Sequence, residues 1–243
     1  MGGNDCTFIR PAFDLVTQIL NTKFSPEVIE YARVRAYSIT DLYGDKANKT
    51  DLLGVLLRYF PATVFAYSHG TEDEIIGPDS TSSVLDLGNT VWLTGKIVVL
   101  NACLTGQRLA PALVHAGARA VFAYNDTLAI RVWSDTYEPL EGFRECINKP
   151  KIIFDGVKAK DVYEAAIAEY NKWIEYWDEK DPVTADVLRH DRDCFALYGN
   201  GESKIMFSTY LLIGLTDTFI IVYVALWAIL RVLKQTEFLW RKR

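Results

Sequence analysis

The stretch KIVVLNACLTGQRLAPALVHAGARAVFAY, residues 96–124, decides the fold of this chain. Its two ends, 96–102 and 118–124, are short and almost continuously apolar, which is typical of parallel strands covered on both faces. Between them, residues 106–117 are rich in Ala and Leu and end at Gly117, a residue that often stands just after a helix. The stretch therefore predicts a strand, a helix and a second, parallel strand.

The same alternation extends from this unit in both directions along the chain. Further strands are predicted at 6–10, 36–43, 63–68 and 192–198, and further helices at 13–35 (broken near Pro26), 49–60 and 161–177. Strands and helices that alternate in this way build layered α/β proteins. We therefore expect an α/β fold, a three-layer α/β/α sandwich with a mostly parallel six-stranded sheet.

Charge and cysteine usage argue against several classes of protein. Residues 1–204 carry 21 Lys and Arg against 29 Asp and Glu, whereas residues 205–243 carry 5 against 2. An acidic body offers no basic surface to a phosphate backbone, so we expect no nucleic-acid partner. No C-x-x-C spacing occurs among the cysteines, so we expect no metal, no cofactor and no disulfide framework. The cysteines are Cys6, Cys103, Cys146 and Cys194.

A long apolar run near the C-terminus predicts one membrane-spanning helix, residues 204–231. The 26 residues between Lys204 and Arg231 contain a single charge, Asp217, and are long enough to cross a bilayer with some tilt. A buried core helix is the alternative, but such a helix rarely stays apolar on all faces over this length. The expected organisation is thus a domain over 1–203, the helix, and a basic tail over 232–243.

The membrane arrangement leaves two questions open. Asp217 lies near the middle of the span, where it would either face a partner helix or bond to nearby hydroxyls and backbone as a neutral acid. The five Lys and Arg after the span favour a C-terminus inside the cell. No N-terminal export signal is visible, which favours insertion after synthesis and a catalytic domain in the cytoplasm. We prefer the second arrangement, a single-pass membrane protein with a cytoplasmic body.

Two chemically reactive side chains follow neighbouring strands. The strand TVFAYS leads directly into His69 and Gly70, and the strand KIVVLNA leads directly into Cys103. Functional groups in open α/β sheets gather at the carboxyl ends of the strands, so we expect the two side chains at one edge. An imidazole beside a thiol makes a nucleophile, and the backbone N–H groups of Cys103 and Gly70 could receive the oxyanion. The alternative is a Cys103 that only fills space in the core.

The other histidines and cysteines are weaker candidates. His115 is a rival base, although its place in the helix after Cys103 is more typical of a C-terminal cap. His190 is expected in a solvated polar loop. Cys6, Cys146 and Cys194 are expected to be structural.

The succession YSHG, KIVVLNACLTGQRLAPALVHAGARAVFAY and CFALYGN resembles clan CD cysteine peptidases, especially the CHAT and gingipain-like families, over about residues 7–201. This resemblance implies a caspase-like fold, with His69 as the general base or acid, Cys103 as the nucleophile and Gly70 as an oxyanion contributor. Asn101 departs from the pattern, because CHAT relatives often have Ser before the Ala-Cys pair. The resemblance also implies a pocket for the side chain that precedes the scissile bond.

The sequence alone does not identify the residues that form this pocket. Asn125 and Asp126 follow the fifth strand and could favour a basic side chain, although Asn-Asp is also a common turn. Trp92, Trp133 and Asp135 are further candidates for its walls.

The function expected from these features is a membrane-anchored cysteine endopeptidase that acts on a protein or peptide substrate through an acyl-enzyme. Two alternatives stay open. One is a catalytically inactive scaffold that assembles through Asp217 and the membrane helix. The other is a thiol redox sensor that pairs Cys103 with Cys146, which would require the two thiols to lie within bonding distance.

Overall fold

Six strands form one sheet in the order β2-β1-β3-β6-β7-β8 in the computed structural model, which describes residues 5–132 and 138–205. All neighbouring pairs are parallel except the last, because β8 runs antiparallel to β7. The prediction of an α/β fold with a mostly parallel six-stranded sheet is confirmed. The strands are β1 (Asp5–Arg10), β2 (Ser38–Tyr43), β3 (Thr63–Tyr67), β6 (Ile97–Asn101), β7 (Ala120–Tyr124) and β8 (Phe195–Gly199).

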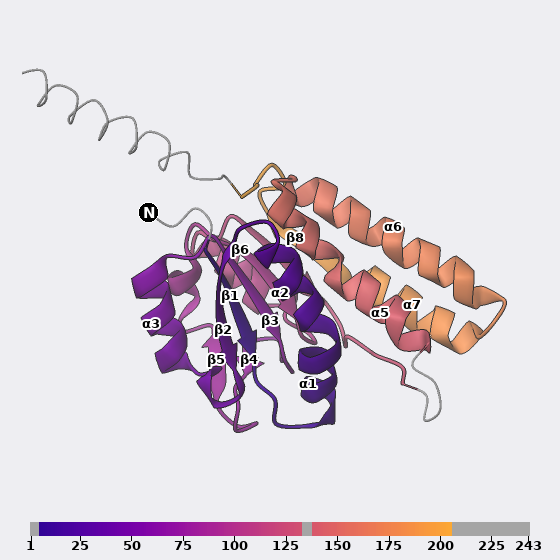
Figure 1. Cartoon of the computed structure of the whole chain (residues 1–243), viewed down its shortest axis with the longest axis horizontal. Helices are drawn as coiled ribbons and strands as arrows, with labels where there is room; N and C mark the ends of the chain where they lie inside the picture. The colour runs from indigo at the N-terminus through magenta and orange to yellow at the C-terminus, as the bar shows by residue number, and fades with distance from the viewer. Residues whose placement is uncertain (1–4, 133–137, 206–243) are drawn as a thin grey trace, which may run out of the picture. The chain divides into compact units, whose positions relative to one another are not determined.

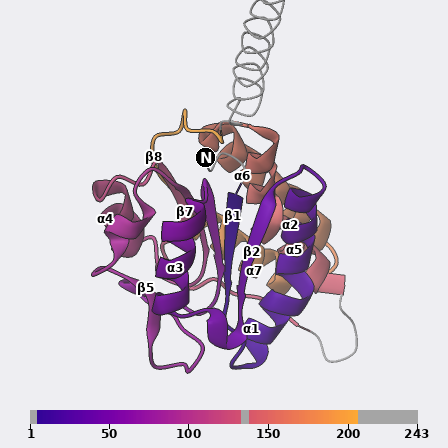
Figure 2. The same cartoon turned by 60° about the vertical axis from the view of Figure 1, so that its left-hand side comes forward.

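Helices cover the sheet on both faces, which makes three layers (Figures 1 and 2). One face carries α1 (Leu15–Ile19), α2 (Ser25–Arg33), α5 (Glu138–Asn148), α6 (Ala159–Asp178) and α7 (Pro182–Cys194). The other carries α3 (Lys49–Tyr59), α4 (Leu109–His115) and a hairpin of β4 (Glu74–Ile76) and β5 (Ser83–Asp86). Shorter turns are a π-helix at Leu20–Phe24 and 3-10 helices at Gly44–Lys46, Thr90–Leu93 and Lys149–Asp155.

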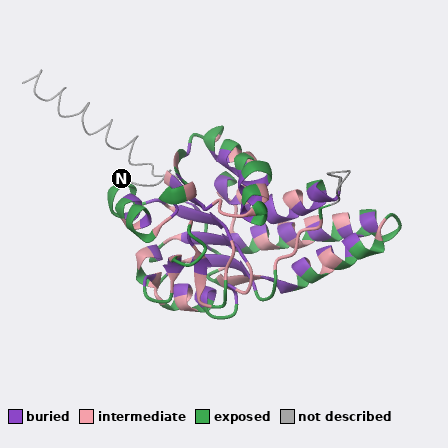
Figure 3. Cartoon of the chain, turned by 90° about the horizontal axis from the view of Figure 1, so that it is seen from below, coloured by how far each residue is buried: buried purple, intermediate pink, exposed green. Residues whose placement is uncertain are grey.

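The central strands bury both of their faces, as their unbroken apolar runs predict (Figure 3). Alternate residues point to opposite sides, and the two sides differ in chemistry. The side under α2, α5, α6 and α7 is aromatic and includes Phe65, Tyr67, Phe122 and Tyr124. The side under α3 and α4 is aliphatic and includes Val64, Ala66, Val98, Leu100 and Val121. Each face of the sheet therefore has a core of its own.

The helix predicted over 13–35 with a break near Pro26 is present as three consecutive pieces. The first helix, α1, passes into the π-helix Leu20–Phe24, and α2 begins at Ser25 with Pro26 in its first turn. Proline is tolerated there because the first N–H groups of a helix have no partner within it. The break is thus a change of helical pitch, not an interruption.

The last predicted strand is wrong at its start. Residues 192–194 still belong to α7, and the strand begins only at Phe195. For the same reason His190, which was expected in a polar loop, lies in a helix. Charged residues dominate α7, so its buried positions, Thr184, Ala185, Leu188, Asp191 and Cys194, do not form the apolar stripe by which a helix is recognised. The sequence also did not predict α5 or the β4–β5 hairpin.

Several predictions fall outside the described residues. These are Trp133, Asp135, Asp217, the basic tail and all but the first two residues of the membrane helix 204–231. Within 5–132 and 138–205, no helix combines the length and apolarity that crossing a bilayer demands. The domain limits and the membrane span stay predictions.

Candidate functional site

The register of two central strands brings His69 and Cys103 to the same edge of the sheet. Parallel pairing of β3 with β6 sets Tyr67 opposite Asn101, an offset equal to the spacing between His69 and Cys103. The pairing continues one step further, because the Ser68 N–H donates to the Asn101 carbonyl at 3.3 Å. Both reactive residues therefore stand two positions beyond the last paired residues. The edge is the carboxyl edge of the sheet, where binding and catalytic groups of α/β proteins collect.

Gly70 lets the two strand tips approach each other. A Cβ added at Gly70 would lie 2.8 Å from the Cys103 carbonyl oxygen and 2.9 Å from the Ala102 Cβ. Such distances are below van der Waals contact, so any side chain here would push the tip of β3 away from that of β6. Gly70 is thus in direct contact with the Cys103 backbone, where the resemblance places an oxyanion contributor.

Two backbone donors at this edge bond to no other residue of the described ranges 5–132 and 138–205. They are the N–H of Gly70 and the N–H of Cys103, which faces its own sulfur. Their neighbours are engaged: the Thr71 N–H donates to the Glu74 carbonyl and the Ile76 N–H to the His69 carbonyl, each at 3.0 Å. The loop after His69 is therefore held against β4 while the Gly70 donor is left available. Free N–H groups beside a thiol are what an oxyanion requires.

His69 is oriented by a carboxylate that the sequence analysis did not identify. Its Nε2 lies 2.7 Å from Asp14 Oδ2, and its ring packs against Phe13 with ring centroids 5.7 Å apart. Burial acts to raise the pKa of Asp14, but hydrogen bonds from the Thr17 N–H, the Thr17 hydroxyl and His69 outweigh it and hold that pKa below its usual value. Asp14 is therefore an anion that accepts a hydrogen bond from the imidazole of His69.

Asp14 is placed by the start of α1. It is the N-cap residue of that helix and forms a capping box with Thr17, whose N–H donates to Asp14 Oδ1 at 2.8 Å. The segment is tied down by the buried Arg10 at the end of β1, whose Nη1 donates to the Asn21 carbonyl at 2.7 Å and to Ser25 Oγ at 2.9 Å. The only sequence signal for Asp14 is an Asp three residues before a Thr, which marks a helix start and not a catalytic group.

Cys103 is half-buried and its thiol has a partner other than His69. The Sγ–H donates to the Leu128 carbonyl, with Sγ and O 3.7 Å apart. Burial raises the pKa of the Cys103 thiol, a backbone hydrogen bond from Leu128 offsets part of this increase, and the neighbouring Asp191 and Asp126 add to it. The structure therefore describes a neutral thiol, and the imidazole bonds to Asp14 instead of to sulfur.

The loop after β7 covers Cys103 and is anchored on α7. We call residues 125–131 the covering segment. Its backbone and side chains bond to the Cys103 strand tip on one side and to α7 on the other. These bonds are Leu104 N–H to Asp126 O at 3.0 Å, His190 Nε2 to Thr127 O at 2.8 Å, Ala129 N–H to Asp191 Oδ1 at 3.0 Å, and Arg131 Nη1 to Asp181 Oδ2 at 2.6 Å.

The candidate pocket residues divide between two places. Asn125 and Asp126 lie exposed at the carboxyl end of β7, beside the Cys103 tip, and their role in a specificity pocket stays a prediction. Trp92 does not lie with them, because it packs on the aliphatic core in the 3-10 helix that precedes β6. His115 ends α4 near Gly117, whose carbonyl accepts from the Gly95 N–H ahead of β6. That is the opposite end of the sheet, so His115 is not a base for Cys103.

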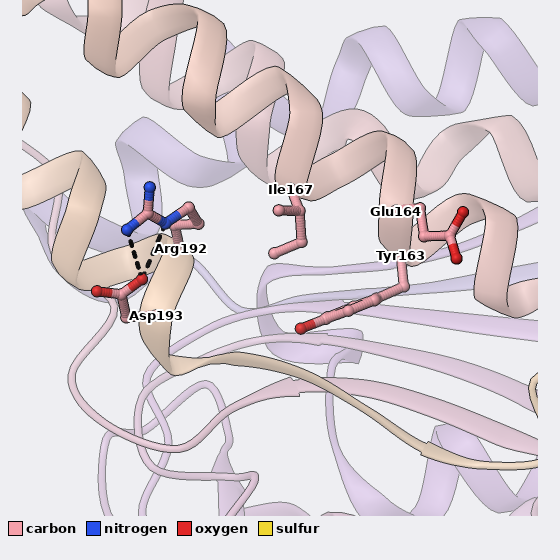
Figure 4. Close-up of a pocket in the computed structure, with 5 residues that line it drawn as sticks. All are labelled: Tyr163, Glu164, Ile167, Arg192 and Asp193. Atoms are coloured by element: carbon pink, nitrogen blue, oxygen red, sulfur yellow. Dashed lines mark hydrogen bonds and ion pairs between the residues drawn. The ribbon is translucent and has the colours of Figure 1, made fainter.

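A hollow of about 460 Å³ lies away from this edge, between α6 and the end of α7 (Figure 4). Tyr163, Glu164 and Ile167 line it from α6, and the Arg192–Asp193 ion pair lines it from α7. Neither His69 nor Cys103 contributes to it, so it is not the candidate site.

Solved structures share this architecture. The chain is similar to the Arg-specific cysteine proteinase gingipain R (TM-score 0.57, 12% identity, 84% of this chain and 48% of that chain). It is also similar to the complex of the Porphyromonas gingivalis RgpB pro- and mature domains (TM-score 0.58, 11% identity, 84% of this chain and 49% of that chain). The chain thus spans about half the length of each. At this identity the likeness shows a caspase-like fold.

No protein-family model matches the chain, and no curated protein matches it in sequence.

Proposed function

We propose that this chain is a cysteine peptidase in which Cys103 is the nucleophile and His69 the general base and acid. The observation that carries the proposal is the β3–β6 register, which brings an imidazole and a thiol to one strand edge beside two N–H donors. Asp14 acts as a positioning residue, since its carboxylate fixes one ring nitrogen of His69. Assignment to the gingipain-like or the CHAT families rests on the sequence motifs alone.

The chemistry follows from these positions. The Cys103 proton passes to His69, the sulfur attacks the carbonyl carbon of the scissile bond, and the N–H groups of Gly70 and Cys103 receive the oxyanion. The intermediate collapses to a thioester as His69 returns the proton to the departing amine. Water then attacks the thioester with His69 as the base, which releases the acid product and restores the thiol.

Before this reaction can begin, one hydrogen bond at the site must change. The Cys103 thiol must exchange the Leu128 carbonyl for the imidazole of His69. An extended peptide at the sheet edge would occupy the space beside the covering segment and favour that exchange.

The proposed substrate is a protein or peptide with a basic residue before the scissile bond. The support is Asp126, an exposed carboxylate next to the Cys103 tip, together with the Arg specificity that the name of gingipain R carries.

The test is covalent labelling of the full-length protein in detergent micelles by two peptidyl acyloxymethyl ketones that differ only in Arg or Leu before the reactive group. We expect labelling that is faster for the Arg probe, that disappears in Cys103→Ala and that persists in Cys146→Ala, whose thiol is buried in α5. Peptide hydrolysis should fall by roughly 10⁶-fold in Cys103→Ala.

Labelling that survives in Cys103→Ala, or no labelling of the wild type, would contradict the peptidase. The inactive scaffold would then be the better account. Equal rates for the two probes would contradict only the basic preference.

We further propose that residues 204–231 anchor the protein in a membrane, with the body in the cytoplasm and Asp217 facing a partner helix. This rests on the sequence run and its basic tail. Alkaline carbonate extraction should leave the full-length protein in the membrane fraction. Protease added to sealed vesicles of known orientation should cleave the body only when the cytoplasmic face is outside.

A further inference from the structure

A second group of reactive side chains lies on one turn of α7. One ring nitrogen of His190, a carboxylate oxygen of Asp191 and the Sγ of Cys194 all lie within 4.8 Å of one another. The residues occupy positions i, i+1 and i+4 of the helix, and positions i and i+4 share a face. The absence of closely spaced cysteines predicted no metal site, whereas this cluster mixes three residue types.

Asp191 has a buried carboxylate oxygen that lacks a partner among the described residues. It is fully buried, and its Oδ1 accepts one hydrogen bond, from the Ala129 N–H at 3.0 Å. Its Oδ2 is buried without a hydrogen-bond partner among the described residues. A buried carboxylate oxygen left in this state costs free energy, and nearly all such atoms in folded proteins have a partner. A bound cation would supply the missing interaction.

His190 has one ring nitrogen bonded to the covering segment, which leaves the other for a metal ion. Its Nε2 lies 2.8 Å from the Thr127 carbonyl, so this nitrogen donates and Nδ1 keeps its lone pair. Metal-ligating histidines commonly donate their second ring N–H to a carbonyl in this way. The side chain is also exposed, which gives an ion a path to the buried Asp191 and Cys194.

Cys194 supplies a soft ligand from the core side. Its Sγ is buried and donates to the Asp191 carbonyl, with Sγ and O 3.4 Å apart. Ligands of one tetrahedral zinc ion lie roughly 3.5 Å apart, given bond lengths of about 2.0–2.3 Å. The three ligand atoms, now within 4.8 Å of one another, would therefore have to move closer together to bind the ion.

We propose that His190, Asp191 and Cys194 bind one zinc ion, with water in the fourth position. A nitrogen, an oxygen and a sulfur ligand together suit this borderline-soft metal, whereas Ca²⁺ and Mg²⁺ take oxygen ligands. Binding releases the Cys194 proton to solvent and leaves the metal in its +2 state. Neither His69 nor Cys103 is a ligand, so zinc binding does not depend on peptidase activity, although His190 and Asp191 also bond to the covering segment.

The test uses metal-free full-length protein titrated with Zn²⁺ in competition with a chromophoric chelator, and with Co²⁺ as a spectroscopic probe. We expect one ion per chain and a thiolate-to-cobalt charge-transfer band. His190→Gln, an exposed change that leaves the core intact, should weaken zinc binding at least about tenfold. Cys194→Ala should remove the band.

Cys103→Ala and Cys146→Ala are the matched controls, and both should keep the band and the affinity. Circular dichroism of each variant shows whether it folds. The proposal is overturned if His190→Gln and Cys194→Ala, both folded, bind zinc like the wild type. It is equally overturned if Cys103→Ala removes the band, because the metal would then sit on the catalytic thiol.

Discussion

The two halves of the candidate site lie on neighbouring strands but are held by different parts of the chain. His69 is held from the N-terminal side by Asp14, and its side chain is 36% exposed. Cys103 is held from the C-terminal side by the covering segment and is half-buried. The imidazole thus faces a carboxylate, whereas the thiol faces a carbonyl oxygen.

The two halves also differ in what their neighbours do to the reactive group. The Asp14 carboxylate fixes the orientation of the His69 ring. On the other side, burial and the neighbouring Asp191 and Asp126 stabilise the protonated thiol, which is the unreactive form of Cys103. The His69 half is therefore prepared for catalysis while the Cys103 half is kept neutral.

The largest effect on kcat should come from a change in the His69 half of the site. Asp14→Asn removes the carboxylate that orients His69, and we expect kcat to fall by about 10²- to 10⁴-fold, the range in which a triad loses its orienting acid. Because Asn is also a good N-cap, the start of α1 should survive. Peptide hydrolysis and the thermal midpoint are the measurements.

A second variant separates the orientation of His69 from the stability of the fold. Asp14→Ala removes the cap as well and should lower stability by about 1 kcal/mol relative to Asp14→Asn. An Asp14→Asn variant that keeps wild-type kcat would show that Asp14 only caps the helix.

A smaller loss should follow from pushing the two halves apart. Gly70→Ala places a Cβ 2.8 Å from the Cys103 carbonyl, and a displacement near 1 Å at a reacting group costs about 10²-fold in rate. Overpacking should also lower the free energy of unfolding by about 1–3 kcal/mol. Hydrolysis and chemical denaturation measure the two effects.

Gly54→Ala is the matched control. A Cβ at Gly54, exposed within α3, meets nothing within 4 Å. It should leave activity unchanged and raise stability by about 0.5–1 kcal/mol, because Gly is a poor helix former. If Gly70→Ala also left activity unchanged and raised stability, the close contact between the strand tips would not be needed for catalysis.

What the sequence could predict is the part of the site that strand register determines. The runs TVFAYS and KIVVLNA are apolar throughout, so their strand identity, parallel pairing and burial follow from composition. Once they pair, His69 and Cys103 fall at one edge with no further information. The expectation that Trp92 joins them had no such basis, and Trp92 packs on the aliphatic core instead.

What the sequence could not predict is which loop meets which reactive group. Asp14 reaches His69 only because the chain turns after β1, and Asp191 reaches the covering segment only because α7 continues to Cys194. These contacts join residues 55 and 62 positions apart through tertiary packing. Neither leaves a periodic pattern in the sequence. Polar residues on loops and charged helices are compatible with many neighbours, whereas a buried strand is compatible with few.

Loosening the covering segment should make the Cys103 thiol more accessible, as the His69 side chain already is. Arg131→Gln breaks the ion pair with Asp181, whose N and O atoms are 2.6 Å apart. A pair of this kind contributes about 0.2–1 kcal/mol, so alkylation of Cys103 by iodoacetamide should speed up about two- to fivefold at most. Arg189→Gln removes ion pairs elsewhere on α7, with Asp186 and with Asp178 of α6, and should not change the rate. Equal alkylation rates in both variants would mean that the Arg131–Asp181 ion pair does not hold the covering segment over Cys103.

The smallest effect tests the charge on the thiol side. Alkylation of Cys103 accelerates with pH as the thiol loses its proton, and burial is the main cause that raises its pKa. Asp191 and Asp126 are the two carboxyl groups that act on the Cys103 thiol, and only Asp126 of these two is exposed enough to change without disturbing the core. Asp126→Asn removes one negative charge while its side-chain oxygen can still accept from the Thr127 N–H, now 2.7 Å away.

Less repulsion of the thiolate should move the pH profile of alkylation to lower pH. Asp45→Asn makes the same change in net charge at an exposed position beyond β2, on the far side of β1 and β3 from Cys103. Screening over that distance should leave its profile in place. A profile that moves equally in both variants would mean that Cys103 responds to the overall charge of the protein, and the contrast between the two halves of the site would then rest on burial alone.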